Sequence, residues 1–537
     1  MDRFGQCMKC PSIGLACQNE SVNLKPGFYW KWESGESRKY YENFTAALQV
    51  QANMFGSSFE QFVSFNGSFP KAYACPVKDA CLGGMESPCS EGYEGPLCAV
   101  CSEGYYQMIS TCQKCPTLPW LIGQILLATL LLTIVVLPLL IGKKLKSTSG
   151  RSITDIVLAR FKIFIGFYQV ASGTLDAFSY VQWPKLLLQL TSYAKLLQLN
   201  LLQIAPVNCF TNQVHTTIYT SFLLSVVTLV AAFITFFAYF YIRWLYLNKA
   251  KRLRADDLKN CFAGTKETSY RYTFLIMFIV YPTVSSQVLQ ILPPSCQTIC
   301  VDSQENSCQS FLKSDYYLEC FTNTHHKFAN VAYAFLTFVV GFPLVTLFLL
   351  WKYHHSEGVQ DGNTMIDENK RNEISAGLSF LYENYSDNCW FWEVLELVRK
   401  IILTSVLVFL GGESRTSLGV AAIMSGLYTI LFASYQPISD RFEHWLQLMS
   451  LLATVANMNV GMLLKIPEEN ISSGVKTELE GTAITVLLVS VNLLVTGMIA
   501  GEWISLFFYP FTHSLNLPNF LWHLSGVKSF VCHHSPF

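Results

Sequence analysis

Residues 376–410 decide the fold, and their second part, residues 389–410, reads CWFWEVLELVRKIILTSVLVFL. Its first half is aromatic and charged, and its second half is apolar enough to run into a membrane. Glu396 lies three residues before Arg399 and four before Lys400, so either cation can pair with it on one helix face. Charges at such a point are costly unless they pair or stay near the lipid headgroups. The stretch therefore predicts a helix with a charge cluster at the mouth of a membrane span.

Two interpretations of this cluster stay open. In the first, its residues couple a cytosolic loop to the helix; the candidates are Trp392, Glu393, Glu396, Arg399 and Lys400. In the second, the same charges only fix the depth of the helix at the membrane surface.

The composition indicates a membrane protein. Of the 537 residues 51% are hydrophobic and 14% are charged, whereas a soluble domain carries about 25% charged residues. The 37 basic and 37 acidic residues balance, so nothing favours binding to nucleic acid. The sequence has no phosphate-binding glycine loop, H-E-x-x-H or G-x-S-x-G motif. We therefore expect no enzyme activity and no cofactor.

Nine apolar segments are close to the roughly 20 residues that a crossing helix needs. They lie at 118–142, 157–181, 217–241, 271–292, 328–351, 393–411, 416–435, 443–464 and 482–506. Basic residues follow the first, third, fifth and seventh segments, which favours a cytosolic location for those loops. We expect an all-α membrane bundle of about nine helices over 118–510, with an extracellular N-terminus and a cytosolic tail at 511–537. The expected location is the plasma membrane.

The region 1–117 is expected to be extracellular and rich in disulfides, because it combines dense cysteines with glycosylation sequons. The sequons lie at Asn19, Asn43 and Asn66, and a fourth, Asn470, falls in an outward loop. The candidates for disulfides are Cys7, Cys10, Cys17, Cys75, Cys81, Cys89, Cys98, Cys101, Cys112, Cys115, Cys209, Cys296, Cys300, Cys308 and Cys320. Zinc is the alternative for the C-x2-C spacings. We favour disulfides and expect no metal, since an exported segment is oxidised first.

Other segments carry more specific expectations. Arg160 and Lys162 open the second span, where they can snorkel to the inner headgroups. The amphipathic stretch 183–206 should be an interfacial or re-entrant helix. The charged stretch 353–388 should be a cytosolic linker. Because Met1–Cys7 lacks the apolar core of a signal peptide, we also expect a longer extracellular chain upstream.

Polar residues and prolines inside the spans are candidates for function. Pro282 and Pro343 interrupt two spans and are candidate hinges, although a kink needed only for packing is the alternative. Polar groups in spans either line a pore or hydrogen-bond neighbouring helices. The candidates are Asp176, Asn457, Asn459 and Asn492.

Several motifs together resemble the TRP-like (polycystin-like) membrane module of eukaryotic proteins. They are Tyr281-Pro282, Gly341-Phe342-Pro343, the stretch 380–385 (FLYENY), Trp392-Glu393, Arg399-Lys400 and Tyr435-Gln436-Pro437. Residues 89–115 resemble EGF/laminin-like or ephrin-receptor-like Cys-rich repeats. The first resemblance covers roughly 118–510 and implies a cation channel gated by force or by a ligand. Cys-rich repeats replace the lipid-binding-like domain of the fungal channel proteins, so their ligands are not carried over.

Three classes of function follow. The first is the cation channel; the second is a cell-surface receptor or adhesion protein that signals through the bundle; the third is a lipid or small-solute transporter. The expected partners are membrane lipids, an extracellular protein or carbohydrate ligand, and further copies of the chain in a homo-oligomer.

Overall fold

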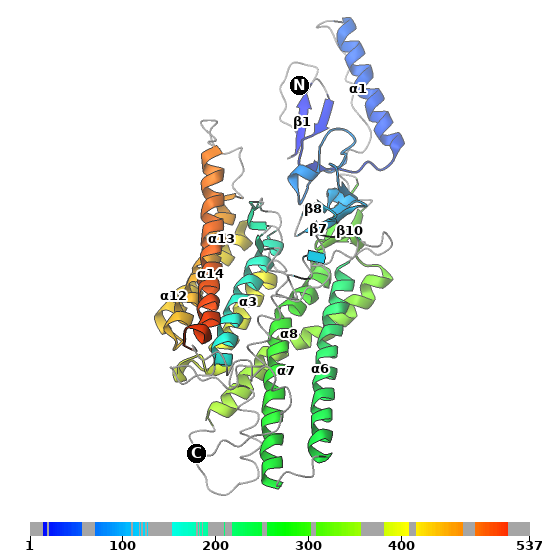
Figure 1. Ribbon diagram of the computed structural model, residues 1–537. Helices are drawn as coiled ribbons and strands as arrows, with labels where there is room; N and C mark the ends of the chain where they lie inside the picture. The colour runs from blue at the N-terminus through cyan, green and yellow to red at the C-terminus, as the bar shows by residue number, and fades with distance from the viewer. Residues whose placement is uncertain are drawn as a thin grey trace.

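The chain is described by a computed structural model (Figure 1). It covers residues 14–18, 21–55, 70–108, 111–117, 153–178, 217–249, 255–301, 308–355, 381–407, 415–464 and 478–513, with isolated positions between them. We call residues 14–117 the head and residues 153–513 the bundle.

The bundle is built from long helices. They are α3 (Ile153–Ala177), α6 (Ile218–Lys249), α7 (Ala255–Ile291), α8 (Asn323–His355), α10 (Trp392–Ile401), α12 (Arg415–Tyr435), α13 (Arg441–Leu464) and α14 (Glu478–His513). Six segments are long and apolar enough to cross a membrane: Ile156–Ala177, Thr273–Ile291, Asn323–Lys352, Thr416–Tyr435, Arg441–Leu464 and Thr482–Gly501. The chain is therefore a membrane protein with a helical bundle.

These six segments correspond to six of the nine predicted spans. The predicted span 217–241 falls on α6, whose strongly apolar part, Ile218–Ala231, is shorter. The span 393–411 falls on α10 and the π-helix that follows it, Ile402–Val406. Almost all of 118–142 lies outside the described residues, as do most of 183–206, of 353–388 and of the tail. The count of nine and the orientation stay predictions.

The helices form two groups, which Figure 1 shows side by side. In the first group α3 packs with α12, α13 and α14, around a core that includes Val170, Leu418, Met458 and Leu488. In the second group α6, α7 and α8 pack together around Phe222, Val284 and Ala332. Each group thus has an apolar core of its own.

Helix α10 belongs to both groups. Its Trp392 packs in a core with Phe167 of α3 and Phe432 of α12. Its Leu397 and Ile401 pack in another core, together with residues of α3, α7 and α8: Leu158, Phe278, Phe342 and Leu350. The short α10 therefore lies at the seam between the two groups.

The two proline-containing helices meet at their prolines. Pro282 lies inside α7 and Pro343 inside α8. The ring of Tyr281 lies 4.9 Å from that of Phe342, and its hydroxyl donates to the carbonyl of Val339. Pro282 has no N–H to donate to the carbonyl four residues before it, Phe278 O. Gln169 of α3 donates to the adjacent carbonyl, Ile279 O, at 3.0 Å.

The head consists of small two-stranded antiparallel sheets, most of them hairpins. They pair β1 (Leu15–Gln18) with β2 (Ser21–Leu24), β3 (Phe28–Tyr29) with β4 (Tyr73–Ala74), β5 (Tyr93–Glu94) with β6 (Val100–Cys101), and β7 (Tyr105–Met108) with β8 (Thr111–Lys114). One helix, α1 (Gly35–Phe55), projects away from them (Figure 1). Hairpins this small bury little apolar surface, so disulfides supply much of the constraint; within the head they join Cys75–Cys81, Cys89–Cys98 and Cys101–Cys112.

The connection between α7 and α8 forms a three-stranded sheet of β9 (Cys296–Cys300), β10 (Cys308–Leu312) and β11 (Asp315–Glu319). Disulfides Cys296–Cys320 and Cys300–Cys308 close it. The head rests on this sheet: Leu97 packs with Ile299 and Tyr316. The Cys300 N–H also donates to the Tyr73 hydroxyl at 2.8 Å.

The described cysteines of the C-x2-C pairs form disulfides, which bears on the zinc alternative. Cys98, Cys101, Cys112 and Cys115 are all in disulfides, Cys115 with Cys209. Oxidised sulfurs do not bind zinc, so zinc is wrong at these two C-x2-C pairs. Cys17 is also bonded, whereas Cys7 and Cys10 lie outside the described residues. Among the described cysteines, Cys389 is free and buried.

We expect Gly173→Leu to destabilise the bundle by about 1–3 kcal/mol, because a side chain there overpacks the contact between α3 and the π-helix. A Cβ at Gly173 would lie 2.6 Å from Thr404 Cγ2. Gly426→Leu is the control, since no atom lies within 4 Å of a Cβ at Gly426. Thermal unfolding of the purified protein in detergent measures both; equal melting temperatures would contradict the close packing of α3 on this helix.

Candidate functional site

The candidate site is a network of charged side chains on α10 at the seam. Glu393, Glu396, Arg399 and Lys400 are all less than 9% exposed. Helix α10 alternates these charges with Val394, Leu397 and Ile401, which are also buried. The network therefore lies inside protein rather than among headgroups, which argues against a role limited to setting helix depth.

The first half of the network joins α3 to α10. Lys162 Nζ donates to Glu393 Oε2 at 2.5 Å, and the Tyr385 hydroxyl donates to the same oxygen at 2.7 Å. The Lys162 side chain is only 10% exposed. The expectation that Lys162 snorkels to the headgroups is therefore wrong: an internal carboxylate makes burial of the ammonium tolerable.

The second half joins α10 to α12. Arg399 donates to both oxygens of Glu396, through Nε at 3.0 Å and through Nη2. Tyr428 of α12 donates to Glu396 Oε2 at 2.8 Å, and the guanidinium lies 5.1 Å from the Tyr428 ring centre. The predicted pairing of Glu396 with Arg399 is confirmed. A two-pronged ion pair with an added hydroxyl donor is the arrangement that best offsets desolvation.

The Lys400 ammonium lies against α3 and α7. Its Nζ lies 5.8 Å from the ring centre of Phe278. A Cβ at Gly166 of α3 would lie 2.7 Å from the same Nζ. The absence of a side chain at Gly166 thus makes room for the ammonium. Lys400 places a buried charge against both helix groups.

The segment before α10 holds the network from the other side. Tyr385 forms a β-bridge with Ile438, and the Ser386 N–H donates to Pro437 O at 2.7 Å. Burial, and next to it the Glu393 carboxylate, raise the pKa of Tyr385 well above its ordinary value. The phenol therefore keeps its proton and remains the donor to Glu393. Motifs that lie far apart in the sequence, 380–385 and 435–437, meet here.

Directly after the network, the backbone changes to a π-helix at Ile402–Val406. Such wide turns are rare and are often found at functional sites. Thr404 and Ser405 are buried there, and their hydroxyl oxygens lie 3.1 Å apart. The backbone irregularity and the charges thus occupy consecutive residues of one helix.

Two of the polar candidates in the last spans form hydrogen bonds with each other. Asn457 and Asn492 exchange two hydrogen bonds, at 3.3 and 2.9 Å, and both are buried between α13 and α14. Asn459 is exposed and donates to Val455 O, while Asp176 is half-buried near the end of α3. In this conformation the asparagine pair joins two helices, as the alternative interpretation expects.

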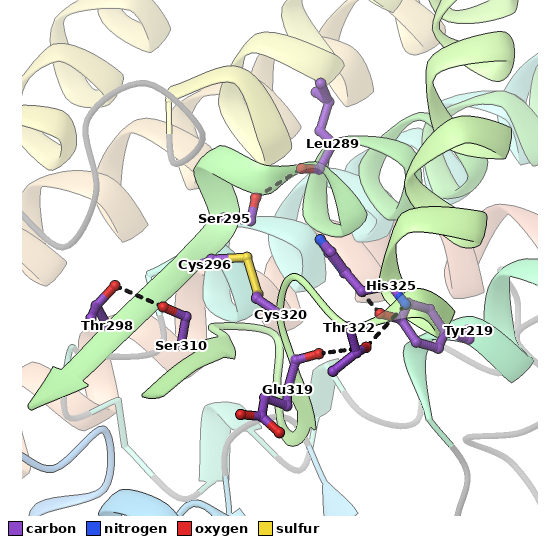
Figure 2. The surroundings of a disulfide bond; sticks show 10 residues. All are labelled: Tyr219, Leu289, Ser295, Cys296, Thr298, Ser310, Glu319, Cys320, Thr322 and His325. Atoms are coloured by element: carbon purple, nitrogen blue, oxygen red, sulfur yellow. Dashed lines mark hydrogen bonds between the residues drawn. A yellow bond between two sulfur atoms is a disulfide. The ribbon is translucent and has the colours of Figure 1, made fainter. Parts of the chain in front are cut away.

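The disulfide Cys296–Cys320 lies beside a buried histidine, and Figure 2 shows its surroundings. His325 Nδ1 lies 2.9 Å from the Tyr219 hydroxyl, and the His325 N–H donates to Thr322 Oγ1. The two sulfurs and this histidine come close enough to suggest a metal site. Because both sulfurs are oxidised, they offer no thiolate, and the cluster reads as a structural cap on α8.

The remaining sequence candidates lie apart from the network. Asn43 is exposed on α1, whereas Asn19, Asn66 and Asn470 lie outside the described residues. Sequence reasoning missed two members of the network, Lys162 and Tyr428. A cation inside an apolar span is a signal that could have pointed to Lys162; Tyr428 has no such signal.

Comparison with known proteins identifies one segment. A family described as a domain of unknown function (DUF7630) matches residues 72–115. This DUF7630 segment is the disulfide-rich part of the head that packs on β9. No curated protein and no solved structure matches the chain.

We expect Glu393→Gln to destabilise the bundle by about 3–5 kcal/mol, because it leaves the Lys162 ammonium buried without its carboxylate. Adding Lys162→Met to this variant should restore much of the loss, since no charge then stays buried there. Unfolding of the purified protein with both single variants and the double variant measures the coupling energy.

The exposed pair Arg38–Glu86 in the head, with an N–O distance of 2.8 Å, is the matched control. Its coupling should stay below about 1 kcal/mol. A coupling energy for Lys162–Glu393 no larger than that of the control would contradict the assignment of a tightly coupled internal pair.

Proposed function

We propose that this membrane protein is a cation channel whose opening is controlled by displacement of its two helix groups at the α10 seam. The proposal follows the resemblance to TRP-like modules. One observation carries it: a buried charge network, followed by a π-helix, occupies α10, a short helix whose side chains belong to the cores of both groups.

Buried ion pairs suit a two-state element. They are stable only with near-ideal geometry, so a small shift between partners costs several kcal/mol. The packing then changes between discrete arrangements rather than gradually. The pairs Lys162–Glu393 and Glu396–Arg399, with Tyr428, hold α10 to α3 and α12. Lys400 and Phe278 bring α7 into the same contact.

The head supplies a route for the stimulus. It rests on the sheet between α7 and α8 and is tied to the bundle by the disulfide Cys115–Cys209. Force or binding at the head would therefore move the outer ends of α7 and α8. These helices carry the motion past Pro282 and Pro343 toward the seam. Proline kinks are natural places for such bending.

A receptor that signals without conducting ions is the second candidate. The head's position on the α7–α8 sheet favours it, because a partner bound there would act on the same two helices. In that case the displacement at α10 would be read by a cytosolic partner instead of opening a pore. Ion flux distinguishes the two.

We expect Tyr428→Phe to raise basal cation flux through the protein reconstituted in liposomes. The variant removes a hydrogen bond to a carboxylate, worth about 1.5–3 kcal/mol, and so shifts the balance between arrangements by roughly tenfold or more. Tyr435→Phe is the control, since Tyr435 also contacts Trp392 but is exposed.

Stretch-activated flux of the wild-type protein is measured in the same liposomes. If neither the stretched wild-type protein nor the Tyr428→Phe variant conducts cations, the channel proposal is refuted and the receptor proposal remains. Equal flux in the two tyrosine variants would refute the role of the seam.

The proposed location is the plasma membrane, with the head outside. Asn43 is exposed on α1, so we expect a glycan on it when the protein is made in eukaryotic cells. Asn384 lies in a sequon but is buried and should stay unmodified. Gel mobility before and after glycosidase treatment checks this, and Asn43→Gln should reduce the shift. A glycan at Asn384 would contradict the proposed orientation.

A further inference from the structure

A cleft of about 360 Å³ lies between the head and the sheet that joins α7 to α8. One wall comes from the head, with Tyr29, Lys31 and Ser87, and the other from β9 and β10, with Ile299, Gln309 and Phe311. Sites for small molecules typically have volumes of about 300–1,000 Å³ and combine apolar walls with a few polar groups. The cleft has both features.

The walls of the cleft are held firmly in place. Cys89, which lines it, is bonded to Cys98, and the adjoining strands β9 and β10 are joined by Cys300–Cys308. The Cys300 N–H donates to the Tyr73 hydroxyl across the junction. Disulfides fix each wall internally and this hydrogen bond joins the two walls, so little conformational entropy is lost when a ligand binds.

One cation, Lys31, lines the cleft and offers a partner for an anion. Glu86 pairs with Arg38 at an N–O distance of 2.8 Å, and Arg38 also lies 3.3 Å from a carboxylate oxygen of Glu42. The Lys31 ammonium lies 3.3 Å from Gln309 Oε1, which is a neutral partner. Among the described residues that line the cleft, Lys31 is thus a cation without an acidic partner. Beside it, Phe311 and Ile299 offer an apolar surface.

Ser87 adds a second, independent sign of a ligand. It is 4% exposed, and its Oγ has no hydrogen-bond partner among the described residues. Its φ of 50° lies in the left-handed region, which is unfavourable for serine. A strained residue with an unpaired buried hydroxyl, placed in the wall of a cleft, is typical of a binding site. Burial raises the pKa of Tyr29, which therefore stays a neutral donor.

From this geometry we propose that the cleft binds a small organic carboxylate. Its carboxylate pairs with Lys31, its apolar part packs on Phe311 and Ile299, and a hydroxyl or carboxylate oxygen accepts from Ser87. Binding itself does not depend on ion conduction. A bound carboxylate would also shift the head on the β9–β11 sheet and thereby change the cation flux. This second part rests on the proposed channel function.

Binding is tested by calorimetry on the full chain in detergent. The probes are 3-phenylpropanoate, L-lactate and D-glucuronate, and 3-phenylpropanamide is the uncharged control. We expect saturable binding of at least one carboxylate and none of the amide. Lys31→Gln should weaken that binding at least tenfold, whereas Lys114→Gln, at an exposed lysine elsewhere on the head, should not change it.

Ser87→Gly provides a variant that keeps the fold, since glycine accepts the positive φ without strain. It should unfold at the same temperature as the wild type, or higher, and bind the carboxylate more weakly. Absence of binding for all three carboxylates, equal binding of the amide, or unchanged affinity in Lys31→Gln would each overturn the proposal. Binding without an effect on flux would contradict the coupling alone.

Discussion

The desolvation of charge at α10 constrains the rest of this structure. Glu393, Glu396, Arg399 and Lys400 are buried, and each would cost several kcal/mol if it lacked compensation. Glu396 and Arg399 compensate each other within α10, and the rest of the compensation comes from other elements: Lys162 on α3, Tyr428 on α12 and Tyr385 on the preceding segment. Three segments must therefore arrive at one place in a fixed register. The apolar cores on either side allow many packings, but these ion pairs allow few.

The same constraint links the two ends of the molecule. At the far end, the head is seated on the β9–β11 sheet, which is closed by two disulfides. From that sheet α7 and α8 run to the seam, in contact with each other around Tyr281 and Phe342. Gln169 of α3 bonds the α7 backbone close to Pro282. The proline-containing turn of α7 is thus tied to the helix that also carries Lys162, so bending of α7 at this turn would bear on the charge network.

Local patterns in the sequence predict much of this arrangement. Apolar length predicts the six long crossing helices, cysteine density predicts the disulfides of the head, and the spacing of Glu396 and Arg399 predicts their pair. Each of these depends on neighbours in sequence. The partner of Lys162 was not predictable, because it is 231 residues away and depends on which side of α3 faces α10. Snorkelling and internal pairing are equally compatible with the sequence.

The division into two helix groups was not predictable either, because it too depends on contacts between residues far apart in the sequence. Helices α3 and α12–α14 are all apolar, as are α6–α8, so composition does not tell which helix packs on which. The position of α10 between them follows from details such as the absence of a side chain at Gly166 and Gly173. These glycines stand where close approach is needed, and only the folded chain shows what approaches. Spacing of charges along a helix says nothing about such contacts.

The central claim is that the buried charges hold the two helix groups in one relative position. It is tested most directly by spin-label distances between the groups, with labels at the exposed positions Leu427 on α12 and Val340 on α8. The account predicts one narrow distance distribution for the wild type and a second, displaced population in Glu396→Gln. An unchanged single distribution in a folded Glu396→Gln protein would contradict it.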